Sequence, residues 1–158
     1  MTLTEWMGNK TFMRVMGLDL GSRTIGVAVS DELGLTAQGV KTIRRKSKDA
    51  DLREILAIVA DFAIEKVVVG LPKNMNGSLG EQAEKVLHWA KVLGERAHLP
   101  VETWDERLST VGASRVLLEA DLSRKKRKEV IDKVAAVLIL QGFLDRTRKE
   151  SDASHLPE

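Results

Sequence analysis

The stretch that decides the fold is Asp19-Leu20-Gly21-Ser22-Arg23-Thr24-Ile25-Gly26-Val27-Ala28. An acidic residue ends one apolar run, Val15–Leu20, and a turn containing glycine leads into a second, Thr24–Ser30. Each run predicts a buried strand, and the short link between them favours an antiparallel hairpin. Asp19 is therefore expected at a rigid strand end, with small residues leaving room for a ligand beside it.

The remaining sequence predicts an α/β domain. Gly34–Ile43 reads as a third strand that completes a meander, and helical spacing from Leu52 to Ala63 follows it, with Asp49 or Asp51 able to cap that helix. Further elements are expected as strands over 66–71 and 101–104 and as helices over 81–97, 109–120 and 129–145, the last apolar on nearly every side, with a basic linker over 121–128. Three meandering strands followed by strand–helix crossovers imply a mixed five-stranded sheet, antiparallel in its first part and parallel in its second, flanked by helices.

Length and composition indicate one domain. A chain of 158 residues with 43% hydrophobic residues can bury one core, which we place over residues 14–146. Residues 1–13 are expected to form a flexible extension and residues 147–158 a flexible tail. The absence of cysteine excludes disulfides and thiolate metal sites. No apolar run approaches the roughly 18 residues of a membrane span, and the N-terminus lacks an apolar signal core, so we expect a cytoplasmic protein.

Charge and aromatic content limit how a nucleic acid could be bound. The formal net charge is only +2, so a nucleic-acid partner would have to be attracted by local basic patches. Aromatic residues make up 4% of the chain and tyrosine is absent, which argues against a surface that grips single strands mainly by base stacking.

Three separated acidic positions suggest a divalent-metal site for phosphate chemistry. Asp19 ends the first strand, Asp105 and Glu106 follow a later strand, and Asp132 lies near the start of the last predicted helix. Mg²⁺ prefers oxygen ligands, and metal ions held by carboxylates can activate water against a phosphodiester. Adjacent residues of a strand face opposite sides, so only one of Asp105 and Glu106 should join Asp19, and Arg107 could pair with the other.

Each acid also has a purely structural interpretation. Asp19 could be a turn residue whose carboxylate accepts backbone N–H groups. Asp132 falls in the first turn of the helix predicted over 129–145, where the helix dipole favours a negative charge in any case.

Several cations could hold a nucleic-acid backbone. Five consecutive cations, Arg124, Lys125, Lys126, Arg127 and Lys128, could form a phosphate-binding arm with salt-dependent affinity, although charge runs are usually solvated loops. Arg23 and Arg107 lie next to the acids, and Lys73 follows a strand end. Ser109 opens a predicted helix, where capping is the first explanation and phosphate binding the second. Arg44, Arg45, Lys46 and Lys48 form a second basic loop, for which solvation is the simpler interpretation.

Taken together, these motifs resemble the YqgF/RuvX family, the Holliday junction resolvase-like or pre-16S rRNA nuclease group. The matching pieces run in the family's order: Asp19 to Asp31, Val69-Gly70-Leu71-Pro72 with Gly77, Asp105 to Thr110, and Asp132 to Ala136 followed by Ile139 to Leu144. As a set they are highly specific, whereas any one of them alone would not be.

The resemblance implies an RNase H-like fold and a hydrolase that cleaves nucleic-acid phosphodiesters with Mg²⁺ or Mn²⁺. It implies that Asp19, Glu106 and Asp132 are the catalytic, metal-binding acids, and it is this resemblance that selects Glu106 over Asp105. It links the chain to maturation of the 5′ end of pre-16S rRNA in ribosome biogenesis and to branched DNA junctions. Related resolvases carry two acids on the last helix, whereas this sequence offers one obvious candidate.

Two other functions compete with that of an endonuclease. One is a nucleic-acid-binding factor without turnover, acting in ribosome assembly or transcription. The other is a nucleotide-binding domain of the actin or sugar-kinase type, against which the short chain speaks because that architecture needs two lobes. The sequence leaves open whether the substrate is RNA or DNA, whether one or two metals bind, and whether the protein forms a homodimer.

Overall fold

The computed structural model describes residues 13–108 and 124–154, with the side chains of 124–129 and 151–154 outside that description. Its centre is a five-stranded sheet with the order β3-β2-β1-β4-β5. The strands are β1 (Val15–Leu20), β2 (Thr24–Ser30), β3 (Ala37–Arg44), β4 (Lys66–Leu71) and β5 (Val101–Asp105). β1, β2 and β3 pair antiparallel, whereas β4 and β5 run parallel to β1, which confirms the predicted mixed sheet.

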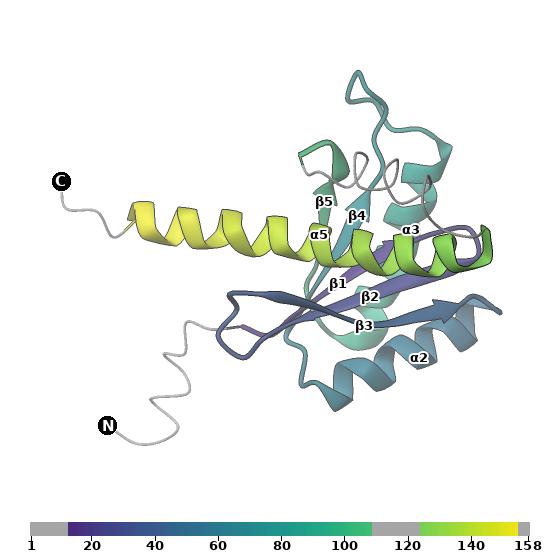
Figure 1. Ribbon diagram of the computed structural model, residues 1–158, viewed down its shortest axis with the longest axis horizontal. Helices are drawn as coiled ribbons and strands as arrows, with labels where there is room; N and C mark the ends of the chain where they lie inside the picture. Colours follow the sequence, from purple (N-terminus) through teal and green to yellow (C-terminus); the bar gives the residue numbers. More distant parts are fainter. Residues whose placement is uncertain (1–12, 109–123, 155–158) are drawn as a thin grey trace.

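Helices cover the two faces of the sheet unequally (Figure 1). Helix α5 (Arg124–Ser154) crosses one face and contacts β1, β2, β3 and β4. Helices α2 (Lys48–Asp61) and α3 (Glu81–Ala97) lie against the other face. No helix among the described residues is long and apolar enough to span a membrane.

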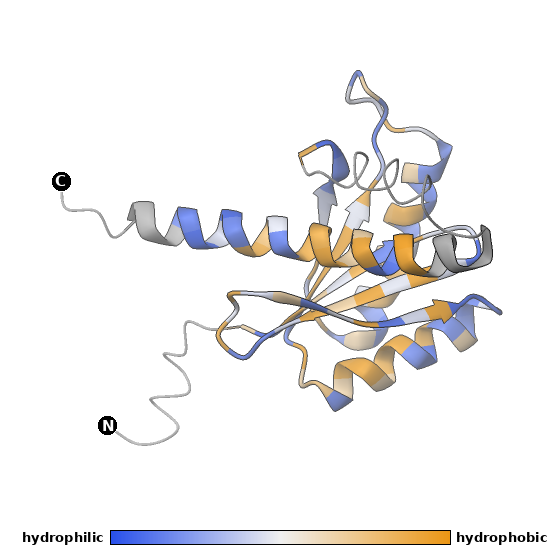
Figure 2. Cartoon of the chain, viewed as in Figure 1, coloured by the Kyte–Doolittle hydropathy of each residue, from blue (hydrophilic) through white to orange (hydrophobic). Residues whose placement is uncertain are grey.

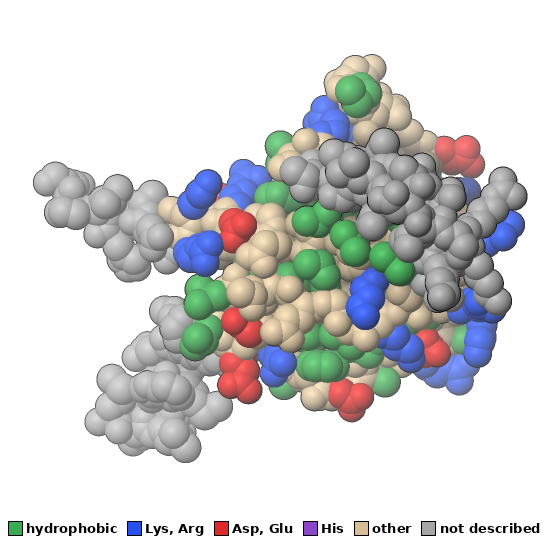
Figure 3. Space-filling model, in the orientation of Figure 1, with side chains coloured by type: hydrophobic (Ala, Val, Ile, Leu, Met, Phe, Trp, Pro, Cys, Tyr) green, Lys and Arg blue, Asp and Glu red, His purple; other side chains and the backbone are tan. Residues whose placement is uncertain are grey.

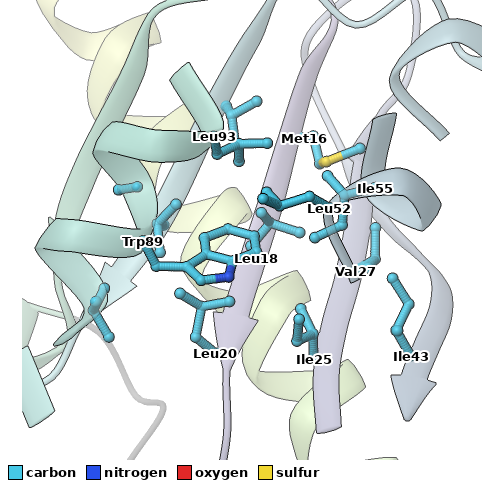
Figure 4. Packing of buried hydrophobic residues seen from close by; sticks show 14 of the residues in the cluster. Met16, Leu18, Leu20, Ile25, Val27, Ile43, Leu52, Ile55, Trp89 and Leu93 are labelled. Atoms are coloured by element: carbon cyan, nitrogen blue, oxygen red, sulfur yellow. The ribbon is translucent and has the colours of Figure 1, made fainter. Parts of the chain in front are cut away.

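The larger core lies between the sheet and the pair α2 and α3 (Figure 4). Leu18 and Leu20 of β1 point into it, together with Ile55 of α2 and Leu93 of α3. Because side chains alternate along a strand, Asp19 between these two leucines faces the opposite side, toward α5. The smaller core under α5 includes Ala136 and Leu140. The apolar character of α5 is concentrated where the helix crosses the sheet, and the coloured residues of its projecting part are mostly hydrophilic (Figure 2).

Two local expectations were wrong at element ends. β3 begins at Ala37, because Gly34 occupies a turn with a φ of 69° in which its N–H donates to the Asp31 carbonyl. Ser47 caps α2, since its side chain accepts a hydrogen bond from the Ala50 N–H, whereas Asp49 and Asp51 lie inside the first turn.

The basic segment predicted as a linker belongs to α5, which begins at Arg124. Lysine and arginine favour helices almost as strongly as leucine, so a basic run is no barrier to helix formation. The same helix continues to Ser154, beyond the domain boundary expected at residue 146. That boundary and the extension over 1–13 stay predictions. The helix expected over 109–120 lies outside the described residues.

Candidate functional site

Asp19 lies on the central strand, one residue from its carboxyl end, and is only 3% exposed. It pairs with Gly26 in the antiparallel register of β1 and β2. Residues directly opposite one another in such a pair share a face of the sheet. The Asp19 carboxylate and the missing side chain of Gly26 therefore both face α5.

Gly26 lets the backbone of α5 settle directly onto β2. A Cβ atom placed on Gly26 would overlap the Asp132 carbonyl oxygen. Gly17 has the same role further along β1, where a Cβ would lie 2.7 Å from the Leu140 Cβ. A glycine within a strand commonly marks such a close backbone approach. The sequence predicted room for a ligand at Gly26, but α5 fills that space. This packing places the backbone of Asp132 next to the strand pair formed by Asp19 and Gly26.

The Asp132 carboxylate lies against the turn between β1 and β2 and is 6% exposed. The Thr24 hydroxyl donates a hydrogen bond to its Oδ2 atom. A Cβ on Gly21 would come within 3.0 Å of the same oxygen, so this glycine does leave room for the carboxylate. Because α5 begins at Arg124, Asp132 lies about two turns into the helix, and the expectation of a first-turn position is wrong. The helix dipole therefore does not account for it.

Asp105 and Glu106 are separated by the end of β5. Asp105 closes the strand and forms an ion pair with Arg107, with 2.6 Å between Asp105 Oδ2 and Arg107 Nη2. Hydrogen bonding by the Arg107 side chain, opposed by partial burial, lowers the pKa of Asp105 below its usual value, and Lys73 adds a smaller electrostatic contribution. Arg107 thus pairs with one of the two adjacent acids, as expected, and that acid is Asp105.

Glu106 begins the short 3₁₀ turn Glu106–Leu108 and reaches back over the sheet. A Cβ on Gly70 would lie 2.8 Å from Glu106 Oε1 and would also collide with Ile139 of α5. Leu18 pairs with Val69 in the parallel register of β1 and β4, so Gly70 is one residue further along, level with Asp19. Glu106 therefore lies on the face of the sheet that carries Asp19 and Asp132.

Three carboxylates from β1, the end of β5 and α5 thus approach one end of the sheet from the same side. Their oxygen donors suit Mg²⁺ or Mn²⁺ in chemistry and in location. Within residues 13–108 and 124–154, however, no three Asp, Glu or His side chains are already gathered closely enough to hold a metal ion. The Asp132 carboxylate is instead turned to the Thr24 hydroxyl. The residues fit a cation by type and by face, and their side chains would have to draw together around it.

The predicted backbone-binding cations are distributed unevenly around these acids. Arg23 is exposed in the turn between β1 and β2, and Lys73 is half-buried close to Asp105. Arg107 is engaged by Asp105 and also donates to the Met75 carbonyl at 3.4 Å. Ser109 lies outside the described residues, as do the side chains of Arg124, Lys125, Lys126, Arg127 and Lys128.

Two residues of this end of the sheet were missed by sequence reasoning. Thr24 is buried and holds Asp132, and Arg45 donates from Nη1 to the Gly21 carbonyl at 2.8 Å. Thr24 could have been recognised as a polar residue opening an apolar strand directly after the glycine turn. Arg45 carries no comparable signal, because it stands within a run of similar cations.

Comparison with known proteins gives concordant results. The RuvX family model, described as Holliday junction resolvase, matches residues 13–146. Relatives from Clostridium kluyveri and Clostridium botulinum, both provisionally named pre-16S rRNA nuclease, are 57% identical over 137 residues, covering 87% of this chain and 100% of each relative.

Among solved structures, Thermus thermophilus RuvC in complex with a Holliday junction substrate aligns with a TM-score of 0.54 at 18% identity, covering 86% of this chain and 96% of that one. A second Thermus thermophilus RuvC structure aligns with a TM-score of 0.51. These likenesses confirm the expected RNase H-like fold. The extent of the family match and the identity to complete relatives show that the chain belongs to the RuvX family.

Proposed function

We propose that this protein is a divalent-metal-dependent endonuclease that hydrolyses nucleic-acid phosphodiester bonds, with Asp19, Glu106 and Asp132 as metal-binding catalytic acids. The observation that carries the proposal is the seating of α5 on Gly26. The contact is made by the backbone of residue 132 and would form with any side chain there. The residue at this position is nevertheless an aspartate, and the contact places it beside Asp19 at the end of the central strand. Membership of the RuvX family supports the same activity.

The three carboxylates would hold the cation, and each is positioned by a different part of the fold. Asp19 is fixed by the central strand, Asp132 by α5, and Glu106 by the turn after β5. A bound divalent cation supplies an activated water and neutralises charge that develops on the leaving oxygen. Carboxylates brought close together repel one another, so a cation between them would also relieve that repulsion.

Thr24 has a positioning role in this proposal. Its hydroxyl donates to Asp132 Oδ2, which fixes one oxygen of that carboxylate. The other oxygen, Oδ1, is then the one that can turn toward Asp19 and Glu106 without breaking this bond.

Basic residues around the acids would bind the substrate backbone. Arg23 and Lys73 flank the carboxylates, and the run Arg124–Lys128 begins the helix that carries Asp132. Because Arg107 is bound to Asp105, we assign it to holding the turn that presents Glu106, with phosphate contact as a secondary role. Ser109 remains a candidate contact next to this turn.

The natural substrate that we propose is the 5′ end of pre-16S rRNA, in the cytoplasm, because the relatives from both clostridia are named as pre-16S rRNA nucleases. The family model and the RuvC neighbour are instead described with Holliday junctions, so branched DNA is the second substrate to be tested. The ion is Mg²⁺ or Mn²⁺. A homodimer, which could place two sites on one branched substrate, stays a prediction.

The direct test compares wild type with Asp19→Asn on a pre-16S rRNA fragment and a four-way DNA junction. We expect Asp19→Asn to lower cleavage at least about 1000-fold with Mn²⁺, because it removes a ligand charge at the centre of the site while preserving side-chain shape. Asp61→Asn on the exposed end of α2 is the matched control and should cleave like wild type. Full activity of a correctly folded Asp19→Asn protein would refute the site.

A nucleic-acid-binding factor without turnover is the second candidate. The observation that favours it is that no ready-made group of three metal ligands exists among the described residues. In that case wild type would bind the RNA fragment equally well in chelator and in Mn²⁺, and it would cleave neither substrate at any metal concentration.

A further inference from the structure

A cleft of about 490 Å³ lies on the other side of the turn that follows Asp19. Leu20, whose side chain faces away from Asp19, forms part of its wall, and Ser22 of the turn forms another part. The starts of α2 and α3 complete the cleft, and Trp89 lies in its lining. This cleft and the three carboxylates therefore lie on opposite sides of one short turn, residues 21–23.

The lining of the cleft is strongly basic. Arg45, Lys46, Lys48 and Lys85 all contribute to it, and Asp51 is the one acid among its lining residues. Asp51 is 3% exposed and already engaged, since Arg45 Nε lies 3.5 Å from its Oδ2 and the Lys46 N–H donates to its Oδ1 at 3.0 Å. The three lysines are exposed, and Figure 3 shows Lys and Arg side chains gathered where β3 leads into α2.

Hydrogen bonds from Arg45 connect the cleft to the turn after Asp19. Arg45 donates from Nη1 to the Gly21 carbonyl at 2.8 Å, and its backbone N–H donates to the Arg23 carbonyl at 2.8 Å. One residue thus contacts both ends of the turn and also pairs with Asp51. Arg45 therefore holds the turn in place, and the distance between a ligand in the cleft and the three carboxylates would vary little.

Several cations around an open cleft attract an anion of matching size. Four positive side chains outnumber the two carboxylates that pair with them, Asp51 with Arg45 and Glu81 with Lys85 at 3.6 Å, so the local potential stays positive and a concave wall focuses it. The N-terminus of α3 adds little to this potential, because Glu81 and Glu84 occupy its first turn and offset the positive end of the helix dipole. Phosphate is the anion for which lysine and arginine are commonly used.

We propose that this cleft binds a phosphodiester group of the same nucleic-acid strand whose scissile phosphate meets Asp19, Glu106 and Asp132. The inference rests on the proposed nuclease function and assigns Arg45, Lys46, Lys48 and Lys85 as substrate-positioning residues. A strand that crosses the end of the sheet passes over residues 21–23, with one phosphate on the acidic side and a neighbouring phosphate in the cleft. The second basic loop, interpreted from sequence as solvated, thereby becomes part of the substrate path.

The test uses the double variant Lys46→Gln/Lys85→Gln. Its matched control is Arg53→Gln/Lys91→Gln, which removes the same charge from exposed positions of α2 and α3 outside the cleft. Binding of a short single-stranded RNA is measured in chelator, where no cleavage can occur. We expect the slope of log affinity against log salt to fall by about 1.4 for the cleft variant, roughly 0.7 for each lost lysine contact to a single strand, and to stay near wild type for the control.

Kinetics and spectroscopy separate this proposal from the proposed nuclease function. On the cleaved substrate, KM should rise about tenfold in the cleft variant while kcat changes less than twofold, because a uniform binding contact has been lost. Backbone amide resonances of Ser22, Lys46 and Lys85 should shift when the RNA is added in chelator.

Unchanged resonances of the cleft residues, or equal salt slopes for the two double variants, would overturn the proposal that the cleft binds the substrate strand. Shifts caused by inorganic pyrophosphate but not by RNA would also overturn it, since the cleft would then serve a free anion. If RNA shifts these resonances and wild type cleaves neither substrate, the proposed nuclease function is wrong, whereas the assignment of the cleft as a nucleic-acid-binding site is supported.

Discussion

The two sides of the turn after Asp19 are built in contrasting ways. On one side, α5 is pressed onto glycines and two acids are almost fully buried. On the other side, exposed lysines surround an open cleft. The buried side should depend on shape, because its acids are placed by backbone contact, whereas the open side should depend on charge and salt. A substrate strand would join the two sides.

The largest effect on the buried side is expected from Gly26→Ala. The added Cβ would overlap the Asp132 backbone, so α5 must move away from β2. We expect a loss of about 3 kcal/mol of unfolding free energy, together with loss of cleavage. Urea denaturation and the cleavage assay measure both.

Gly39→Ala is the matched control on β3. There the atoms nearest to a Cβ belong to the flexible side chain of Lys133, so the loss should stay below about 1 kcal/mol and cleavage should persist. Equal effects of the two substitutions on stability and cleavage would show that the contact between Gly26 and Asp132 does not position α5 for catalysis.

Thr24→Val should have an intermediate effect. It keeps the shape of the side chain and removes the hydroxyl that donates to Asp132. We expect about 1–3 kcal/mol of destabilisation and a loss of cleavage that Thr24→Ser partly restores. Wild-type cleavage by a stable Thr24→Val protein would remove Thr24 from its positioning role.

The smallest effect is expected from Arg107→Gln. Because Arg107 lowers the pKa of Asp105 in the folded protein, their interaction stabilises the fold above the unfolded pKa of aspartate, near 3.9, and is lost as the pH falls through the lower folded pKa. The difference in unfolding free energy between wild type and Arg107→Gln should therefore be largest near neutral pH and should shrink below about pH 4. A difference that does not change with pH would mean that Arg107 stabilises the turn by packing alone.

The sequence predicted the hairpin, the mixed sheet and the bounds of α3 correctly, because apolar periodicity and strong turn residues specify local structure. It could not show why Asp132 lies on the same face of the sheet as Asp19, because that placement depends on Gly17 and Gly26, which contact residues of α5 that are distant in the chain. The choice between Asp105 and Glu106 also depended on the family resemblance.

Basic residues were the hardest to interpret from sequence alone. The run beginning at Arg124 predicted a linker and is helical, because lysine and arginine tolerate helix and loop alike. The loop at Arg45 was interpreted as solvated, because nothing in its composition reveals that its cations face a common cleft.

Binding of Mn²⁺ to the intact protein, measured by calorimetry without nucleic acid, tests the central claim most directly. The account predicts that wild type and Asp61→Asn bind Mn²⁺ with the same affinity, and that Asp19→Asn and Asp132→Asn each weaken that binding at least about tenfold. Undiminished Mn²⁺ binding by both site variants, or no binding by wild type, would contradict a shared metal site at these carboxylates.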